Sequence, residues 1–188
     1  VLTRLGRPQD AMPHFQTVIE LQPESAEARL NLGIVLADQY DLEAALEAFS
    51  KAVDLAPSSA TARYNKGRAL YDLGRGDEAR RELETATNLP AALYLLALIE
   101  EQQGDRVRAL ALLREFVALQ PNNADGRYKL GQSLAAANQR DGAIEHWKRA
   151  VEINPEHAEA LYNLARALRA DKPSEAKTYQ WRFAALER

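Results

Sequence analysis

Small and bulky apolar residues recur along this chain at a fixed interval. Ala11, Ala45 and Ala79 are evenly spaced, and Ala109 and Ala143 repeat the same interval. A bulky apolar residue stands four positions after each of these alanines, in the series Phe15, Phe49, Leu83, Leu113 and Trp147. Spacings of three, four and seven positions place side chains on one stripe of an α-helix. The pattern therefore predicts a repeated helix with one buried face.

A second set of small residues precedes these markers and indicates a second helix in every unit. Its members are Gly33, Gly67, Ala97, Gly131 and Ala165. Prolines close most units, at Pro23, Pro57, Pro121 and Pro155. Each unit then holds two helices of roughly 12–15 residues, a length that is marginal in isolation. Neither helix can bury its stripe alone, so we expect neighbouring units to stack and share a core.

Residues that tolerate a left-handed conformation lie between the two expected helices. Gly6, Gly74 and Gly104 occupy this place in their units, where a residue with positive φ is wanted after a helix. Asn138 holds the same place and is the next most tolerant residue. Tyr40 holds it in another unit and fits least well.

Together these markers resemble the tetratricopeptide repeat (TPR), with small residues at positions 8, 20 and 27, an aromatic or bulky residue at 24 and proline at 32. The period of that repeat is about 34 residues. The resemblance implies an all-α fold, a right-handed superhelical solenoid of antiparallel helix pairs whose first helices line the concave face. We expect one solenoid domain over residues 1–188. Its units are 1–25 (lacking most of the first helix), 26–59, 60–89 (short), 90–123, 124–157 and 158–188 (irregular, with a capping helix).

Two units depart from the pattern. Ala109 follows Ala79 four positions too early, and Leu89-Pro90-Ala91 replaces the usual turn, so we expect a tight joint there. In the last unit Pro173 falls near the first position of the final helix, where proline is well tolerated.

Composition narrows the possible functions. Apolar residues make up 46% of the chain, charged residues 27%, and the net charge is −3, so we expect neither a nucleic-acid partner nor an anionic membrane surface. The longest apolar run, 93–99, is far shorter than a bilayer span. Cysteine is absent, and the three histidines (His14, His146 and His157) lack metal-ligand spacing. With no phosphate loop or nucleophile motif either, we expect no cofactor, no metal and no enzymatic activity.

The resemblance also implies which first-helix residues face the groove. The candidates for peptide binding are Asn31, Tyr64, Asn65, Arg68, Tyr94, Tyr128, Lys129, Tyr162, Asn163 and Arg166. Tyrosine offers rigid contact area with a hydroxyl, and asparagine can pair with both an N–H and a C=O of an extended peptide. A purely structural role is the alternative, because tyrosine at the fifth position also packs between neighbouring first helices.

The groove charges do not form the carboxylate clamp that some family members use for chaperone tails. That clamp needs lysine and asparagine where this chain has Leu30 and Ile34. Acidic residues mark the first part of the groove, at Glu27, Asp38, Asp72 and Glu101. Cations mark its last part, at Lys129, Arg166 and Arg169, against Asp125 and Glu159. Such a mixture suits a ligand with one basic and one acidic end, but it is more typical of a solvated helix face.

We therefore expect a protein–protein interaction scaffold that binds a peptide or protein segment in its concave groove. Because the chain begins with Val1 and not Met, a first alternative is the non-catalytic arm of a larger enzyme, such as a glycosyltransferase or sulfotransferase. A second alternative is a self-association module that forms homo-oligomers through apolar open ends, with Phe15 at one end and Trp181 and Phe183 at the other. A cysteine-free helical chain suits cytoplasm or periplasm, with cytoplasm slightly favoured.

Overall fold

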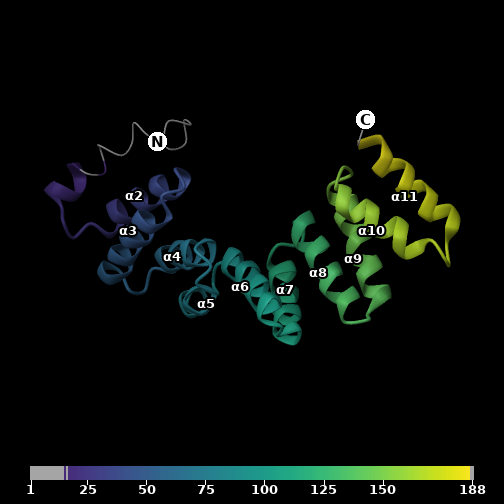
Figure 1. Ribbon diagram of the computed structural model, residues 1–188, viewed down its shortest axis with the longest axis horizontal. Coiled ribbons are helices and arrows are strands. Elements are labelled where there is room, and N and C mark those ends of the chain that lie inside the picture. Colours follow the sequence, from purple (N-terminus) through teal and green to yellow (C-terminus); the bar gives the residue numbers. More distant parts are fainter. Residues whose placement is uncertain (1–14, 16, 187–188) are drawn as a thin grey trace. The chain divides into compact units, whose positions relative to one another are not determined.

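The computed structural model describes residue 15 and residues 17–186, and this part of the chain contains helices and turns but no strand. The early repeat markers Gly6, Ala11 and His14 lie outside it. After a helical stretch at 17–21, the helices run as α2 (Ala26–Asp38), α3 (Leu42–Leu55), α4 (Ala60–Asp72), α5 (Gly76–Glu84), α6 (Pro90–Gln103), α7 (Arg106–Leu119), α8 (Ala124–Ala136), α9 (Arg140–Ile153), α10 (Ala158–Leu168) and α11 (Pro173–Leu186) (Figure 1). No helix in the described residues is both long and apolar enough to cross a membrane.

The helices fall into two compact units, residues 1–99 and residues 100–188. In the first unit α2 pairs with α3 and α4 with α5, while α3 also packs on α4. In the second unit α8 pairs with α9 and α10 with α11, and α7 packs on α8 as α9 does on α10. Helices in the interior of each unit thus pack on the helix before them and on the helix after them, as a stack of helix pairs requires.

The periodic apolar residues form the core. The marker alanines Ala45, Ala79, Ala109 and Ala143 are fully buried, and so are Leu83 and Leu113. Phe49 and Trp147, the aromatic members of the same series, retain 2% and 4% of their surface. The small residues of the first helices allow these rings to come close. A Cβ built on Gly33 would lie only 2.5 Å from Cε1 of Phe49, so no side chain fits there.

The turn inside each helix pair follows one design. Tyr40, Gly74, Gly104 and Asn138 all have positive φ, between 59° and 88°, as the sequence predicts. The residue after each one donates its N–H to the carbonyl five positions earlier, at 2.8–3.0 Å. This is the Schellman arrangement, which satisfies carbonyls left free at a helix end.

The first helices begin at a capping side chain that recurs at the same repeat position, in Ser25, Ser59, Asn123 and His157. Each accepts a hydrogen bond from the backbone N–H three positions later, at 2.8–3.4 Å. Capping of this kind contributes about 1 kcal/mol to a helix.

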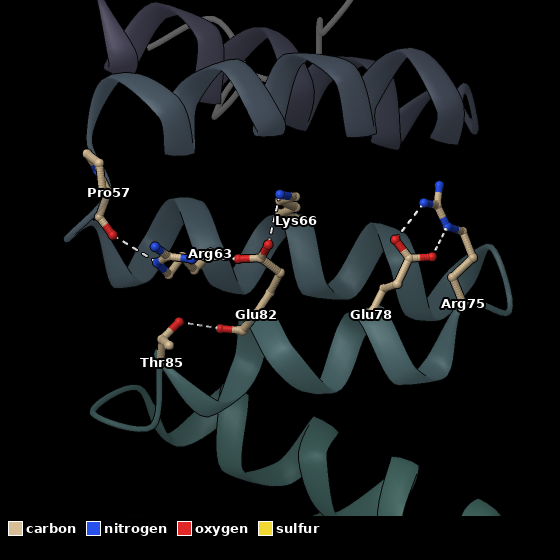
Figure 2. A network of polar contacts seen from close by, with 7 residues as sticks. All are labelled: Pro57, Arg63, Lys66, Arg75, Glu78, Glu82 and Thr85. Atoms are coloured by element: carbon tan, nitrogen blue, oxygen red, sulfur yellow. Dashed lines mark hydrogen bonds and ion pairs between the residues drawn. The ribbon is translucent and has the colours of Figure 1, made fainter.

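An arginine ties two of the first helices to the turn before them. Arg63 Nε donates to the carbonyl of Pro57 at 2.8 Å, and Arg127 Nε donates to that of Pro121 at 2.8 Å. Figure 2 shows that Arg63 also reaches Glu82 of α5, which accepts from Lys66 as well, both at 2.8 Å. The network fixes α4 against both its preceding turn and its partner helix.

The short unit is short because its second helix is. Helix α5 has 9 residues, whereas α3 and α9 have 14 each. Thr85 caps it by donating its hydroxyl hydrogen to the carbonyl of Glu82 at 2.8 Å (Figure 2), and Ala86 is still buried after the helix has ended. Helix α6 then begins directly at Pro90, and α11 begins at Pro173 in the same way.

Candidate binding surface

A cavity of about 360 Å³ opens between the first helices α2 and α4 of the N-terminal unit, and Leu42 and Phe49 of the second helix α3 also line it. Helix α2 contributes Ile34 and Asp38, and α4 contributes Asn65, Arg68 and Asp72. These are the ninth and thirteenth positions of one repeat and the sixth, ninth and thirteenth of the next. Two of the candidate residues, Asn65 and Arg68, therefore lie at one opening in this unit.

Asn65 and Arg68 differ in how firmly they are held. The amide nitrogen of Asn65 donates to the Thr61 carbonyl within its own helix at 2.8 Å. Arg68 is exposed and its Nε is 3.9 Å from the Asp72 carboxylate, a long contact in solvent that contributes little energy. Its guanidinium can thus turn toward a ligand at small cost.

The remaining candidates of this unit lie away from the cavity. Asn31 on α2 and Tyr64 on α4 are half-buried and do not line it, and Tyr94 on α6 is half-buried as well. None of the candidate tyrosines therefore lines this cavity.

In the C-terminal unit Tyr128 joins two successive first helices. Its hydroxyl oxygen accepts a hydrogen bond from Gln132 Nε2 at 2.6 Å and another from Asn163 Nδ2 of α10 at 3.3 Å. Its ring packs on the imidazole of His157 with the centroids 4.8 Å apart. Burial raises the pKa of Tyr128, and the nearby charge of Glu159 raises it further. The phenol is therefore a packing and hydrogen-bonding group that stays protonated.

Lys129 is engaged within the same unit. Its ammonium lies 2.6 Å from the carboxylate of Glu101, which also accepts a hydrogen bond from the Ser133 hydroxyl. The side chains of Lys129 and Glu101 are 21% and 25% exposed, so the pair is shielded from much of the solvent. A peptide that used Lys129 would first have to break this contact.

Tyr162 and Arg166 lie together at a second opening, a cleft of about 740 Å³ between α10 and α11. The Tyr162 ring is 5.7 Å from that of Phe183, and the Arg166 guanidinium sits 5.9 Å from the centre of Tyr162. The α11 wall also carries Lys177 and Gln180, which sequence reasoning did not single out. Their spacing from Pro173, four and seven positions, was a visible signal that they share a helix face.

The surroundings of the two described histidines indicate structural roles and not metal binding. His157 is buried, and its Nδ1 accepts from the Ala160 N–H at 3.4 Å to cap α10. Burial lowers the pKa of His146, and the charge of Arg127 lowers it further. Within the described residues no group of three or more potential ligands is placed to hold a metal.

Comparison with known proteins identifies the repeat. Four models described as tetratricopeptide repeat or TPR repeat match residues 1–60, 36–99, 90–133 and 131–170. A search of curated proteins found no match.

Solved structures show the same fold. A crystal structure of YrrB, described as a TPR protein with an unusual peptide-binding site, is 26% identical, with 92% of each chain covered and a TM-score of 0.77. PilF of Pseudomonas aeruginosa is 19% identical over 98% of this chain and 86% of its own, with a TM-score of 0.89. PilW, described as a type IV pilus biogenesis factor, is 22% identical over 98% and 88%, with a TM-score of 0.82.

The matches to PilF and PilW, at 19% and 22% identity, concern the fold alone. The repeat models follow one another along residues 1–170, and the helix pairs beneath them carry the buried alanines and aromatic residues of the repeat. The all-α fold expected from the sequence is confirmed, and the chain belongs to the tetratricopeptide repeat family.

Proposed function

We propose that this TPR scaffold binds a peptide or protein segment on the face that its first helices share. TPR repeats are protein-interaction scaffolds in general, and the fold is typically non-catalytic. The cavity between α2 and α4 carries the finer proposal, because it brings polar and apolar groups of two repeats to one opening.

The chemistry of that cavity suits an extended peptide. Asn65 offers an amide that can pair with a backbone N–H and a backbone C=O, and Arg68 offers donors for a carbonyl or carboxylate. Phe49 and Ala69 belong to an apolar floor that can receive a side chain. A volume of about 360 Å³ lies at the small end of the range of about 300–1,000 Å³ that is typical of ligand sites.

The comparison with YrrB supports the same proposal. That protein is described as having a peptide-binding site, and it aligns with 92% of this chain at 26% identity. The C-terminal unit adds the contact between Tyr128 and Asn163, in which successive first helices meet through their polar faces at 3.3 Å.

The test begins with a peptide display library selected against the 188-residue chain. Binding of the selected peptides is then measured by fluorescence polarisation for the wild type and for the double variant Asn65→Ala/Arg68→Ala. The loss of two hydrogen bonds, each contributing about 1 kcal/mol, is expected to weaken binding more than tenfold.

The matched control is Lys51→Ala/Asp54→Ala, which alters two exposed residues of the second helix α3. It should leave affinity unchanged, and circular dichroism should show equal helicity for all three proteins. Selected peptides that bind the Asn65/Arg68 variant as tightly as the wild type would exclude the α2–α4 cavity as their site.

A further inference from the structure

The cleft between α10 and α11 differs in charge from the cavity between α2 and α4. The N-terminal cavity is lined by Asp38 and Asp72 together with Arg68. Among the described residues, the C-terminal cleft is lined by three cations, Arg166, Arg169 and Lys177, and by no acidic side chain. The two openings therefore present different electrostatic conditions to a ligand.

The three cations of the cleft are exposed and carry no ion pair to a carboxylate elsewhere in the described part of the chain. The acidic residues nearest to these cations in the sequence form ion pairs with residues of α9. Asp171 pairs with Arg140 at 2.5 Å and Glu175 with Lys148 at 2.5 Å. This leaves the positive charge of the cleft uncompensated.

The walls between the charges are apolar. Tyr162 is half exposed, and its ring lies 5.7 Å from the centre of Phe183 on the facing helix. Small side chains line the cleft beside these packed rings, at Ala165, Ala176 and Ala184. At about 740 Å³ the cleft is roughly twice the size of the N-terminal cavity, which has about 360 Å³.

We infer that the α10–α11 cleft binds an acidic segment of a partner protein that packs a bulky apolar side chain against the Tyr162–Phe183 ring pair. Carboxylates of the segment pair with Arg169 and Lys177 at the rim, where charge complementarity guides association. A free anion would leave the apolar walls uncovered, and a neutral apolar segment would leave the cations unpaired. The inference deepens the proposed function, on which it rests, because Tyr162 and Arg166 belong to the candidate first-helix surface.

The experiment compares three synthetic peptides of one design. Each has a central Leu-Phe pair and differs only in its flanking residues, which are all Glu, all Gln or all Lys. Fluorescence polarisation against the full chain is expected to rank them Glu first, Gln second and Lys last. Affinity for the Glu peptide should fall at least tenfold when the salt concentration rises from about 50 to about 300 mM, as rim charges are screened.

Charge reversal locates the site. Arg169→Glu/Lys177→Glu should weaken binding of the Glu peptide at least tenfold and should make the Lys peptide the better ligand. The matched control Lys51→Glu/Arg149→Glu changes the net charge equally at two exposed positions on α3 and α9. It should retain the wild-type ranking. Equal binding of the Glu and Lys peptides by the wild type, or no effect of the reversal at the cleft, overturns the inference.

Two further results separate this inference from the proposed function. If library peptides depend on Asn65 and Arg68 while the Glu and Lys peptides bind equally well, the proposed function stands and the acidic cleft is refuted. Sedimentation analysis covers the remaining occupant, a second copy of the chain. Self-association that disappears in Arg169→Glu/Lys177→Glu would show that the cleft is filled by the protein itself, and the inference of an acidic partner would be wrong.

Discussion

The indole of Trp147 lies directly against the backbone of α8 at Gly131. A Cβ built on Gly131 would be 2.5 Å from Trp147 Nε1 and 3.1 Å from the Ala143 carbonyl oxygen. The same Nε1 donates a hydrogen bond to the Tyr128 carbonyl at 3.2 Å. Only a residue without a side chain leaves the indole in its buried place, so Gly131 and Trp147 fit together only as a pair.

Gly131→Ala should therefore destabilise the protein, although alanine is the better helix former. The indole must shift or lose its hydrogen bond, and overpacking of this kind costs about 1–3 kcal/mol. Gly142→Ala is the matched control, because its Cβ would meet nothing nearer than 3.5 Å. It should stabilise α9 by up to about 1 kcal/mol. The free energies of unfolding of both variants are measured in urea. Equal stabilities of Gly131→Ala and Gly142→Ala would contradict the tight contact at Gly131.

Tyr40→Gly is expected to raise stability by about 1 kcal/mol, because Tyr40 is held at φ 62° and a left-handed conformation is costly for a residue with a Cβ. Its side chain is 89% exposed, so little packing is lost with it. Asn138→Gly, at φ 59°, should give a smaller gain because asparagine tolerates this region. Thermal unfolding followed by circular dichroism gives the comparison. A lower melting temperature for Tyr40→Gly would show that its side chain contributes through contacts.

The arginines that donate hydrogen bonds to proline carbonyls should contribute more to stability when their side chains make more contacts. Arg127→Ala removes one hydrogen bond, to Pro121, and should cost about 1 kcal/mol. Arg63→Ala also removes the contact with Glu82 and should cost more, about 1.5 kcal/mol. Arg68→Ala, with only its long contact to Asp72, should change stability by less than about 0.5 kcal/mol. Urea midpoints that do not follow this order would refute a role for the proline carbonyls.

His146 should make stability depend on pH on the acid side of neutrality. Burial lowers its pKa in the folded state, so the unfolded chain, with a pKa near 6.5, takes up the proton more readily. The stability that neutral His146 contributes is then present above about pH 6.5 and is lost as the pH falls through the folded-state pKa.

The measurement is an NMR titration of the His146 ring, which should protonate below the usual histidine range. In urea unfolding, the difference in stability between pH 7.5 and pH 5 should be smaller for His146→Gln than for the wild type. His157 is present in both proteins and cancels from this comparison. An NMR midpoint at or above about 6.5 would contradict the assignment.

The sequence predicted the core because the core is periodic. Ala45, Phe49 and their counterparts could be placed on buried stripes from spacing alone, and Tyr40 could be assigned to a left-handed position from its place in the unit. The site was harder, since its polar groups are paired by contacts from one helix pair to the next. Glu101 meets Lys129 in this way and Asn163 meets Tyr128, and no local pattern reveals such pairs.

The short third unit was likewise only partly predictable from the sequence. The early arrival of Ala109 indicated that four positions were missing, and the altered turn at Leu89-Pro90-Ala91 was the expected place. The structure takes the loss largely from α5, which ends at Glu84 under the cap of Thr85. The spacing of the markers shows how many residues the unit lacks, but it does not show whether they are missing from a helix or from a turn. The interval from Pro57 to Arg63 was equally visible, yet only the folded turn shows what it does.

Four of the first helices have their N-cap residue in the turn just before them, at Ser25, Ser59, Asn123 and His157. Ser25 and Ser59 are separated by one full repeat, as are Asn123 and His157. A segment that runs from one cap to the next therefore contains one helix pair together with the side chain that caps its first helix, and we call such a segment a cassette. Duplicating or removing such a cassette joins an existing helix end to an existing helix start. The chain can thus be lengthened or shortened in whole repeats during evolution or engineering without any new junction having to be invented.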